Sequence, residues 1–260
     1  MFTPARLCRA HPIIFSCLTI ISLFLIWCSR SLLYDALTLA ALPLIWSHNS
    51  DEFLIIPKDG FDITFEYYDR HQDSAAPYEN LVPPILHHIA LSEGAAAHAK
   101  WTDVRQTCLN MHKGWDAFLW TDATADSFVA EHFPDLVGMW RSYRYPIQKI
   151  DSLRYMVLYH YGGKHRSGIG MGRVVGLTWL TPGVILDMDL QCNRALGPLR
   201  RFDFVAPAAH PTGFSIGFMM ASPRNEFVGE LVHNLERYNR HWLGLPYPTV
   251  MFSTGCHYAS

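Results

Sequence analysis

Two aspartates separated by one residue close a short apolar run. The run reads VILDMD, beginning at Val184 and ending with Asp187, Met188 and Asp189. A buried strand is expected here, with both carboxylates at its tip. Carboxylate oxygens in this arrangement suit a hard divalent cation, Mn²⁺ or Mg²⁺, and leave positions for water and a diphosphate. Such a cation would neutralise charge on a departing nucleoside diphosphate, so Asp187 and Asp189 are our candidate catalytic and metal-binding residues.

A helix is expected ahead of these aspartates, in the segment YPIQKIDSLRYMVLYHYGG that begins at Tyr145. Pro146 suits the first helical position, and Gly162 with Gly163 allows the positive φ that ends helices. One buried face is predicted from apolar residues at three- and four-residue spacing: Ile147, Ile150, Leu153, Val157 and Tyr161. Asp151 and Arg154 share one part of the helix surface, either as ligand-binding side chains or as an ordinary intrahelical ion pair.

The pattern YPIQxxDxxRYxxLYxYGG followed by Asp-Met-Asp resembles glycosyltransferase family 32, a group of sugar transferases with an Asp-x-Asp signature. The resemblance extends from about Val82 to the C-terminus. The fungal members include the catalytic subunit of mannosyl phosphorylinositol ceramide synthase and the initiating α-1,6-mannosyltransferase of N-glycan outer chains. The resemblance implies a metal-dependent transfer that retains the anomeric configuration.

The resemblance also implies roles for individual residues. Asp187 and Asp189 would hold the metal, and Asp151 and Arg154 would contact the sugar-nucleotide, the guanidinium offering its fork of donors. In the expected first strand, VPPILHHIA, neighbouring side chains face opposite sides, and we assign His87 to the nucleotide. A hydrogen-bonded core histidine is the alternative. Many relatives have Trp at the position of Ala90, so a contact made by that Trp does not transfer.

Strands and helices alternate in the region that shows the resemblance. The expected elements are a helix at 101–111, a strand at 116–120, helices at 126–132 and 135–142, strands at 202–205 and 214–221, and a helix that starts at Ser222-Pro223. This order predicts an α/β fold with a Rossmann-like sheet whose ligand lies beyond the carboxyl ends of the strands. With the resemblance, the fold class is a GT-A glycosyltransferase domain with an N-terminal membrane helix.

Composition narrows the class of protein. Half of the 260 residues are hydrophobic, enough for one α/β domain and a membrane segment. A net charge of −2 provides no basic footprint, which argues against nucleic acid as a partner. Among the six cysteines, Cys108, Cys192 and Cys256 lie beyond the N-terminal apolar region, so a lumenal domain could form at most one internal disulfide. The sequence leaves open which two would pair.

The N-terminal region is expected to anchor the chain in a membrane. Arg6 and Arg9 precede the uncharged run 13–27, which predicts a single-pass type II protein with its catalytic domain in the Golgi lumen. We divide the chain into a cytosolic tail and anchor at 1–30, a second apolar segment and stalk at 31–81, and a catalytic domain at 82–260. The alternatives are a cleaved signal peptide and a two-span hairpin that includes 32–46 and leaves the Asp-x-Asp in the cytosol.

The sequence departs from the family pattern in two places. About twenty residues, KHRSGIGMGRVVGLTWLTPG at 164–183, separate Gly163 from the Asp-x-Asp strand, where the family has almost none. Our hypothesis is a retained intron, since Gly163-Lys164 can be encoded by GGTAAG, which contains a splice-donor sequence. The chain also ends at FSTGCHYAS, where relatives continue, so we expect a C-terminally incomplete catalytic domain.

The expected reaction moves mannose from GDP-mannose to inositol phosphoceramide at a membrane, with a regulatory membrane subunit as a candidate partner. Three alternatives stay open. The acceptor could be a protein N-glycan, the chain could be a non-catalytic membrane partner that kept the fold, or it could be an inactive truncated product that never folds stably.

Overall fold

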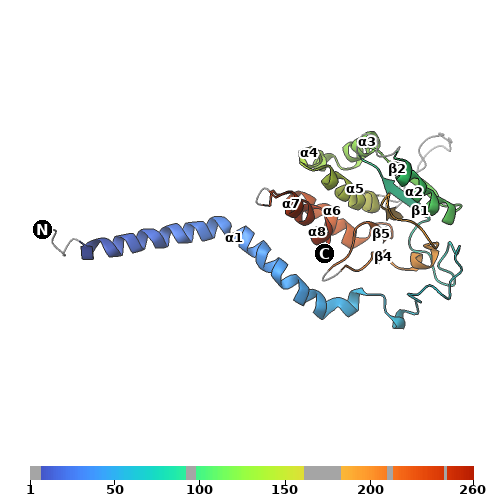
Figure 1. Cartoon of the computed structure of the whole chain (residues 1–260), viewed down its shortest axis with the longest axis horizontal. Coiled ribbons are helices and arrows are strands. Elements are labelled where there is room, and N and C mark those ends of the chain that lie inside the picture. Colours follow the sequence, from blue (N-terminus) through green and yellow to red (C-terminus); the bar gives the residue numbers. More distant parts are fainter. Residues whose placement is uncertain (1–6, 92–97, 161–182, 210–212, 243–244) are drawn as a thin grey trace, which may run out of the picture. The chain divides into compact units, whose positions relative to one another are not determined.

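The chain folds into two compact units, Met1–Leu54 and Ile55–Ser260. A computed structural model describes residues 7–91, 98–160, 183–209, 213–242 and 245–260 (Figure 1). The predicted insert at 164–183 lies outside the described residues except for Gly183. The predicted domain boundaries stay predictions.

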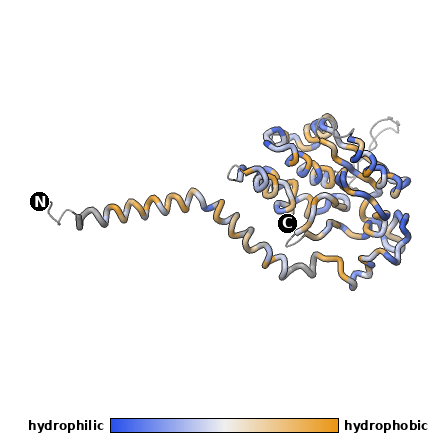
Figure 2. The backbone as a smooth tube through the Cα atoms, viewed as in Figure 1, coloured by the Kyte–Doolittle hydropathy of each residue, from blue (hydrophilic) through white to orange (hydrophobic). Residues whose placement is uncertain are grey.

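The first unit is built on one long helix, α1 (Leu7–Phe53), of 47 residues. This helix contains both apolar segments and two internal prolines, Pro12 and Pro43. Hydrophobic residues line much of its length (Figure 2), and many of their side chains are exposed, including Phe15, Leu23 and Trp27. Among the helices of the described residues, none combines the length and the apolar character that crossing a membrane requires. The predicted membrane anchor therefore stays a prediction.

The second unit contains a sheet of five strands in the order β2-β1-β3-β5-β4 (Figure 1). The strands are β1 (Ile85–Ile89), β2 (Asp116–Trp120), β3 (Val184–Leu186), β4 (Phe204–Val205) and β5 (Phe218–Ala221). β2, β1 and β3 run parallel, whereas β5 is antiparallel to both β3 and β4. The carboxyl ends of the three parallel strands therefore share one edge of the sheet, where α/β proteins bind ligands. This mixed α/β sheet confirms the α/β class.

The helices follow the predicted order with shifted ends. They are η2 (Pro57–Asp59), α2 (Ala99–Met111), α3 (Asp122–His132), η4 (Pro134–Leu136), α4 (Val137–Ser142), α5 (Pro146–His160), η5 (Gly197–Arg201), α6 (Glu226–Tyr238), α7 (Pro246–Ser253) and α8 (Cys256–Ala259). α5 begins at Pro146 as predicted, and its predicted Gly-Gly end lies outside the described residues. β3 ends immediately before Asp187, also as predicted.

Two predictions in the C-terminal third are wrong in detail. Ser222 does not cap α6; the cap is Asn225, whose side chain accepts a hydrogen bond from the Val228 N–H. Arg224 adopts φ of +57°, which a right-handed helix through Ser222-Pro223 cannot include. The strand predicted at 214–221 begins only at Phe218, because Phe214 forms an isolated bridge elsewhere.

Side chains alternate between two apolar layers on the two faces of the sheet. Ile89 and Ile185 pack with residues of α3, α4, α5 and α6 in the larger core. Leu86 and Leu186 point to the other face and pack with Cys108 of α2 and with η5. We call these the α5 face and the α2 face. The two residues that directly follow β3 keep this alternation, because Asp187 contacts Arg154 of α5 and Met188 packs with Ala90.

Candidate active site

Asp187 is fixed at the tip of β3 by its backbone and its neighbours. Its N–H donates to the carbonyl oxygen of Gly217 at 2.9 Å. Like Ile185 two residues earlier, it points toward the α5 face, and its side chain is 32% exposed. A Cβ atom on Gly217 would lie 2.8 Å from Asp187 Oδ2, closer than such contacts occur. Glycine at position 217 therefore leaves the room that the carboxylate occupies.

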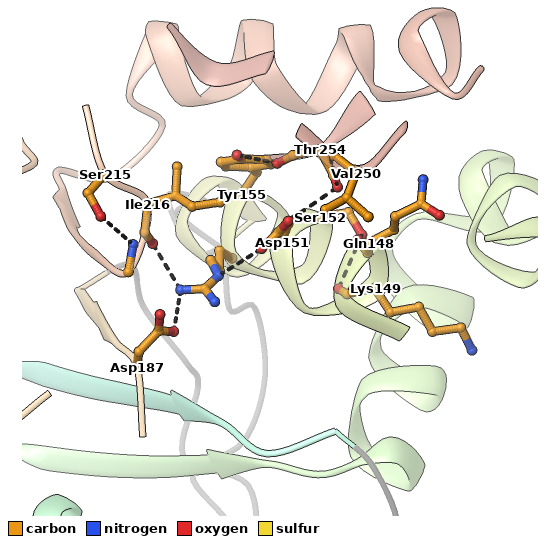
Figure 3. Close-up of polar contacts among 12 residues, drawn as sticks. Gln148, Lys149, Asp151, Ser152, Tyr155, Asp187, Ser215, Ile216, Val250 and Thr254 are labelled. Atoms are coloured by element: carbon orange, nitrogen blue, oxygen red, sulfur yellow. Dashed lines mark hydrogen bonds and ion pairs between the residues drawn. The ribbon is translucent and has the colours of Figure 1, made fainter. Parts of the chain in front are cut away.

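Arg154 of α5 joins two carboxylates, those of Asp151 and Asp187, which are labelled in Figure 3. Its Nη1 forms an ion pair with Asp187 Oδ1 and donates to the Ile216 carbonyl oxygen at 2.9 Å. Its Nε lies 3.6 Å from Oδ1 of Asp151, three residues earlier on the same helix. The side chains of Arg154 and Asp151 are each only 5% exposed. The guanidinium thus connects the helix, the strand tip and the segment that leads into β5.

Burial and neighbouring charges shift the protonation of both carboxylates. Burial raises the pKa of Asp151 to about 7, with Asp187 adding to the rise and Arg154 and a hydrogen bond from Thr254 opposing it. Burial also raises the pKa of Asp187, as does the charge of Asp189, while Arg154 opposes the rise. Two carboxylates share one guanidinium, so the group carries an excess negative charge when both are ionised.

Asp189 differs from Asp187 in being exposed to solvent. No hydrogen bond or ion pair joins its carboxylate to the residues that the structure describes, although its charge acts on Asp187. In the described part of the chain, no three His, Cys, Asp or Glu side chains come together as a metal-holding group. Two carboxylates, one of them exposed, suit a cation that takes part of its oxygen shell from the protein and the rest from water and a ligand's phosphates.

A disulfide ties the segment after the aspartates to α2. Cys108 of α2 is bonded to Cys192, and the Cys192 N–H donates to Thr107 Oγ1 at 3.1 Å. Met188, between the two aspartates, packs against Ala90 on the α2 face. The sequence left this pairing open, and the third candidate, Cys256, is a free thiol. The loop that carries Asp189 is therefore attached at both of its ends.

His87 lies apart from the contacts that join Asp151, Arg154 and Asp187. It is fully buried, its Nδ1 accepts a hydrogen bond from Trp120 Nε1 at 3.3 Å, and its ring stacks on Phe118. These surroundings are those of a core histidine, and its assignment to the nucleotide stays a prediction. His88 is equally buried on the other side of β1.

Two residues of this site escaped the sequence analysis. Gly217 makes room for Asp187, and Thr254 donates to Asp151 Oδ2 at 3.3 Å. Thr254 stands 103 residues after its partner, and no local pattern marks it. The only available signal was a short polar run, Ser253-Thr254-Gly255, between two apolar segments.

Comparisons with known proteins identify related sequences. Residues 98–164 match the model of the glycosyltransferase sugar-binding region containing DXD motif. Mannosyl phosphorylinositol ceramide synthase SUR1 of Saccharomyces cerevisiae is 33% identical over 181 residues, which cover 70% of this chain and 41% of that protein. Inositol phosphoceramide mannosyltransferase 1 of Schizosaccharomyces pombe is 30% identical over 213 residues, which cover 80% of this chain and 60% of that protein.

The matches cover only part of this chain and of its relatives. The family match ends at residue 164, where the predicted insert begins. The chain spans about two fifths and three fifths of the length of these two curated relatives. Among solved structures, the PaToxG glycosyltransferase superposes with a TM-score of 0.39 and 12% identity, covering 73% of this chain and 72% of that chain.

Proposed function

Because this chain belongs to the glycosyltransferase family whose sugar-binding region contains a DXD motif, we propose that it transfers mannose from GDP-mannose to inositol phosphoceramide. The observation that carries the proposal is the convergence of Asp151, Arg154 and Asp187 at the tip of β3. The named activities of the two fungal relatives support mannose as the sugar and a sphingolipid as the acceptor. The three parallel strands support a GT-A arrangement of the domain.

The chain's own residues account for binding and charge stabilisation. Asp189 and Asp187 would hold a divalent cation, Mn²⁺ or Mg²⁺, which when bound neutralises charge on the leaving diphosphate. Arg154 directs its donors toward the same place and can bind sugar or phosphate oxygens. Asp151 offers acceptor oxygens to sugar hydroxyls.

Retention of configuration is part of the proposal. We assign Asp151 to sugar binding and not to covalent attack, because Arg154 and Thr254 hold its carboxylate in a fixed position. The leaving group would depart from the same face of the sugar on which the acceptor enters. Fixed charges would stabilise this departure, so the reaction would require no further carboxylate.

We also propose a single-pass type II protein of the Golgi membrane, with residues 13–27 as its anchor. The uncharged run within α1 and the arginines that precede it support this location. Protease protection of intact vesicles tests it, because a lumenal C-terminus resists digestion until detergent is added.

Product analysis tests the proposed reaction. Membranes containing the full chain are incubated with radiolabelled GDP-mannose and either inositol phosphoceramide or an N-glycan oligosaccharide, with and without chelator. We expect labelled lipid that disappears with chelator and with Asp189→Asn. Asp103→Asn, an exposed aspartate on α2, is the matched control and should keep full activity.

Three outcomes would overturn the proposal in different ways. Labelled oligosaccharide without labelled lipid would reassign the acceptor to N-glycans. Undiminished transfer by the Asp187→Asn/Asp189→Asn variant would remove the aspartates from the reaction. Full complementation of a strain lacking the activity by that inactive variant would identify a non-catalytic partner subunit.

A further inference from the structure

A buried polar seam joins α5 to the junction between α7 and α8. Five polar side chains in this seam are almost entirely inaccessible to solvent: Gln148, Asp151, Ser152, Ser253 and Thr254. Buried polar groups destabilise a fold unless they are hydrogen-bonded, so a seam of this kind specifies one arrangement of its partners. It lies beside the carboxylate that we assign to sugar binding.

Three hydrogen bonds cross the seam from α5, and Figure 3 draws the two that involve Thr254. Gln148 Nε2 donates to Ser253 Oγ at 2.7 Å, and the Tyr155 hydroxyl donates to the Thr254 carbonyl oxygen at 2.6 Å. Between them, Thr254 Oγ1 donates to Asp151 Oδ2 at 3.3 Å. Residues 148, 151 and 155 lie on one helix face at spacings of three and four, so one short segment can reach all of them.

The backbone of Thr254 is fixed independently of Asp151. Its N–H donates to the Val250 carbonyl oxygen at 3.1 Å, and its own carbonyl oxygen is held by Tyr155. Thr254 Oγ1 also lies 3.4 Å from the Val250 carbonyl oxygen, a longer alternative acceptor for its single proton. The hydroxyl is therefore presented to Asp151 by a rigid backbone.

We propose that Thr254 is a positioning residue for the donor sugar, because it fixes the plane of the Asp151 carboxylate that receives the sugar hydroxyls. This inference rests on the proposed function. Arg154 approaches Oδ1 of Asp151 from one side and Thr254 engages Oδ2 from the other. The α7–α8 junction is thus part of the donor site, although it lies far from the DXD motif in the sequence.

Few charged groups surround Asp151. Arg154 and Asp187 influence it from the helix and the strand tip, and the hydroxyls of Tyr143 and Tyr155 interact with it electrostatically. Burial raises the pKa of Tyr143 and of Tyr155 well above the usual range, so both stay neutral at the pH of an assay. Removing the Thr254 donor therefore raises the pKa of Asp151 further, because that hydrogen bond favours the ionised carboxylate.

The test compares Thr254→Val, which removes the hydroxyl and keeps the shape, with Thr254→Ser, which keeps the hydroxyl. The full chain is solubilised in detergent, and binding of radiolabelled GDP-mannose and mannosyl transfer are each measured from pH 6 to pH 9. We expect Thr254→Val to lose about tenfold or more in kcat/KM at pH 7, with a smaller loss at high pH. Thr254→Ser should restore both the rate and the pH profile.

Thr249→Val is the matched control. Thr249 is a buried threonine of α7 whose Oγ1 accepts from the Trp242 N–H, so its loss perturbs the same helix without touching Asp151. We expect its pH profile to match the wild type. If Thr254→Val fails to fold, Thr254→Ala is used instead, because it removes the same hydroxyl and its smaller side chain does not have to fill the same space.

The possible failures are distinguishable. Wild-type chain that neither binds nor turns over GDP-mannose would defeat the proposed function itself. Wild-type chain that binds it, together with a folded Thr254→Val or Thr254→Ala variant of unchanged affinity, rate and pH profile, would defeat only the positioning role. Equal losses of activity in Thr254→Val and Thr254→Ser would also defeat the positioning role, because they would show that activity depends on the packing of this side chain and not on its hydroxyl.

Discussion

The two faces of the sheet hold the tip of β3 by different means. On the α5 face, Asp187 is held by a chain of charges that runs through Arg154 to Asp151 and ends at Thr254. On the α2 face, the same loop is held by a disulfide and by apolar packing of Met188. One face uses groups that can bind a polar ligand, and the other uses groups that cannot.

The two faces also differ in how their buried charged and polar side chains are paired. Each charged side chain in the α5-face group has an oppositely charged or hydrogen-bonding partner. On the α2 face, both ring nitrogens of His88 are buried with neither a hydrogen bond nor an ion pair among the described residues, whereas the buried Arg154 Nε on the α5 face lacks a hydrogen bond but keeps its ion pair with Asp151. This difference supports the proposal that the α5 face orders charge for the reaction, whereas the α2 face supplies rigid attachment. Changes on the first should alter activity, and changes on the second should alter stability alone.

The largest effect is expected from Arg154→Met. Asp151 and Asp187 would then be left without their shared cation, and losing one partner of a buried ion pair costs about 3 to 5 kcal/mol of unfolding free energy. The loss should be greatest at high pH. Without Arg154 the pKa of Asp151 rises above its present value of about 7, so protonation relieves the repulsion as the pH falls. Urea unfolding at several pH values measures this, and GDP-mannose binding should be abolished throughout.

Lys149→Met is the control for that prediction. Lys149 lies on the same helix and pairs with Asp126 at 3.9 Å, but the two side chains are 30% and 60% exposed. Exposed pairs contribute about 0 to 1 kcal/mol, so the variant should stay within that range and retain binding. A cost for Arg154→Met no greater than this would mean that the charges of the α5 face are not coupled as described.

The disulfide should have the next largest effect. It closes a loop across 84 residues, and removing such a bridge typically costs about 2 to 4 kcal/mol. The Cys108→Ser/Cys192→Ser variant should lose this stability in urea unfolding while the folded fraction binds GDP-mannose with unchanged affinity. Cys17→Ser, which removes an exposed free thiol, is the control. Folded but reduced protein that no longer binds the donor would show that the α2 face also orders the ligand.

The fold could be predicted where the signal is local. Pro146 marks the start of α5 because proline tolerates the first helical turn, and the apolar run at Val184 identifies β3. The helix was predicted to start at Ser222 because serine is a common N-cap residue and proline is common at the first helical position. In the structure Ser222 donates its hydroxyl hydrogen bond to Asp203 instead, and the helix begins only after the strained Arg224.

The site could be predicted only in part. Asp151, Arg154 and Asp187 belong to one motif, and the structure brings them into contact. Thr254, Gly217 and the pairing of Cys108 with Cys192 depend on contacts between distant segments. Such contacts are set by how the sheet and helices pack, and no periodicity in the sequence encodes them.

The smallest effect is expected from His88→Leu on the α2 face. His88 is fully buried and neither ring nitrogen has a hydrogen-bond partner among the described residues. Replacing an unsatisfied buried polar group by an apolar one of similar size is close to neutral or slightly stabilising, so at pH 8 we expect a change of about 1 kcal/mol or less. Donor binding should be unaffected, as for other changes on this face.

The same variant should change the response to acid. Burial, with Arg105 nearby, lowers the pKa of His88 to about 3, whereas an unfolded chain takes up the proton near pH 6.5. Between these values the unfolded state binds more protons than the folded state, so His88 reduces stability as the pH falls below 6.5. At pH 5 this loss is about 2 kcal/mol, and His88→Leu should recover it in urea unfolding. His71→Gln, a change at an exposed histidine, should recover nothing. An unchanged acid response in His88→Leu would mean that His88 already has a partner in solution, and the contrast between the two faces would then rest on the disulfide alone.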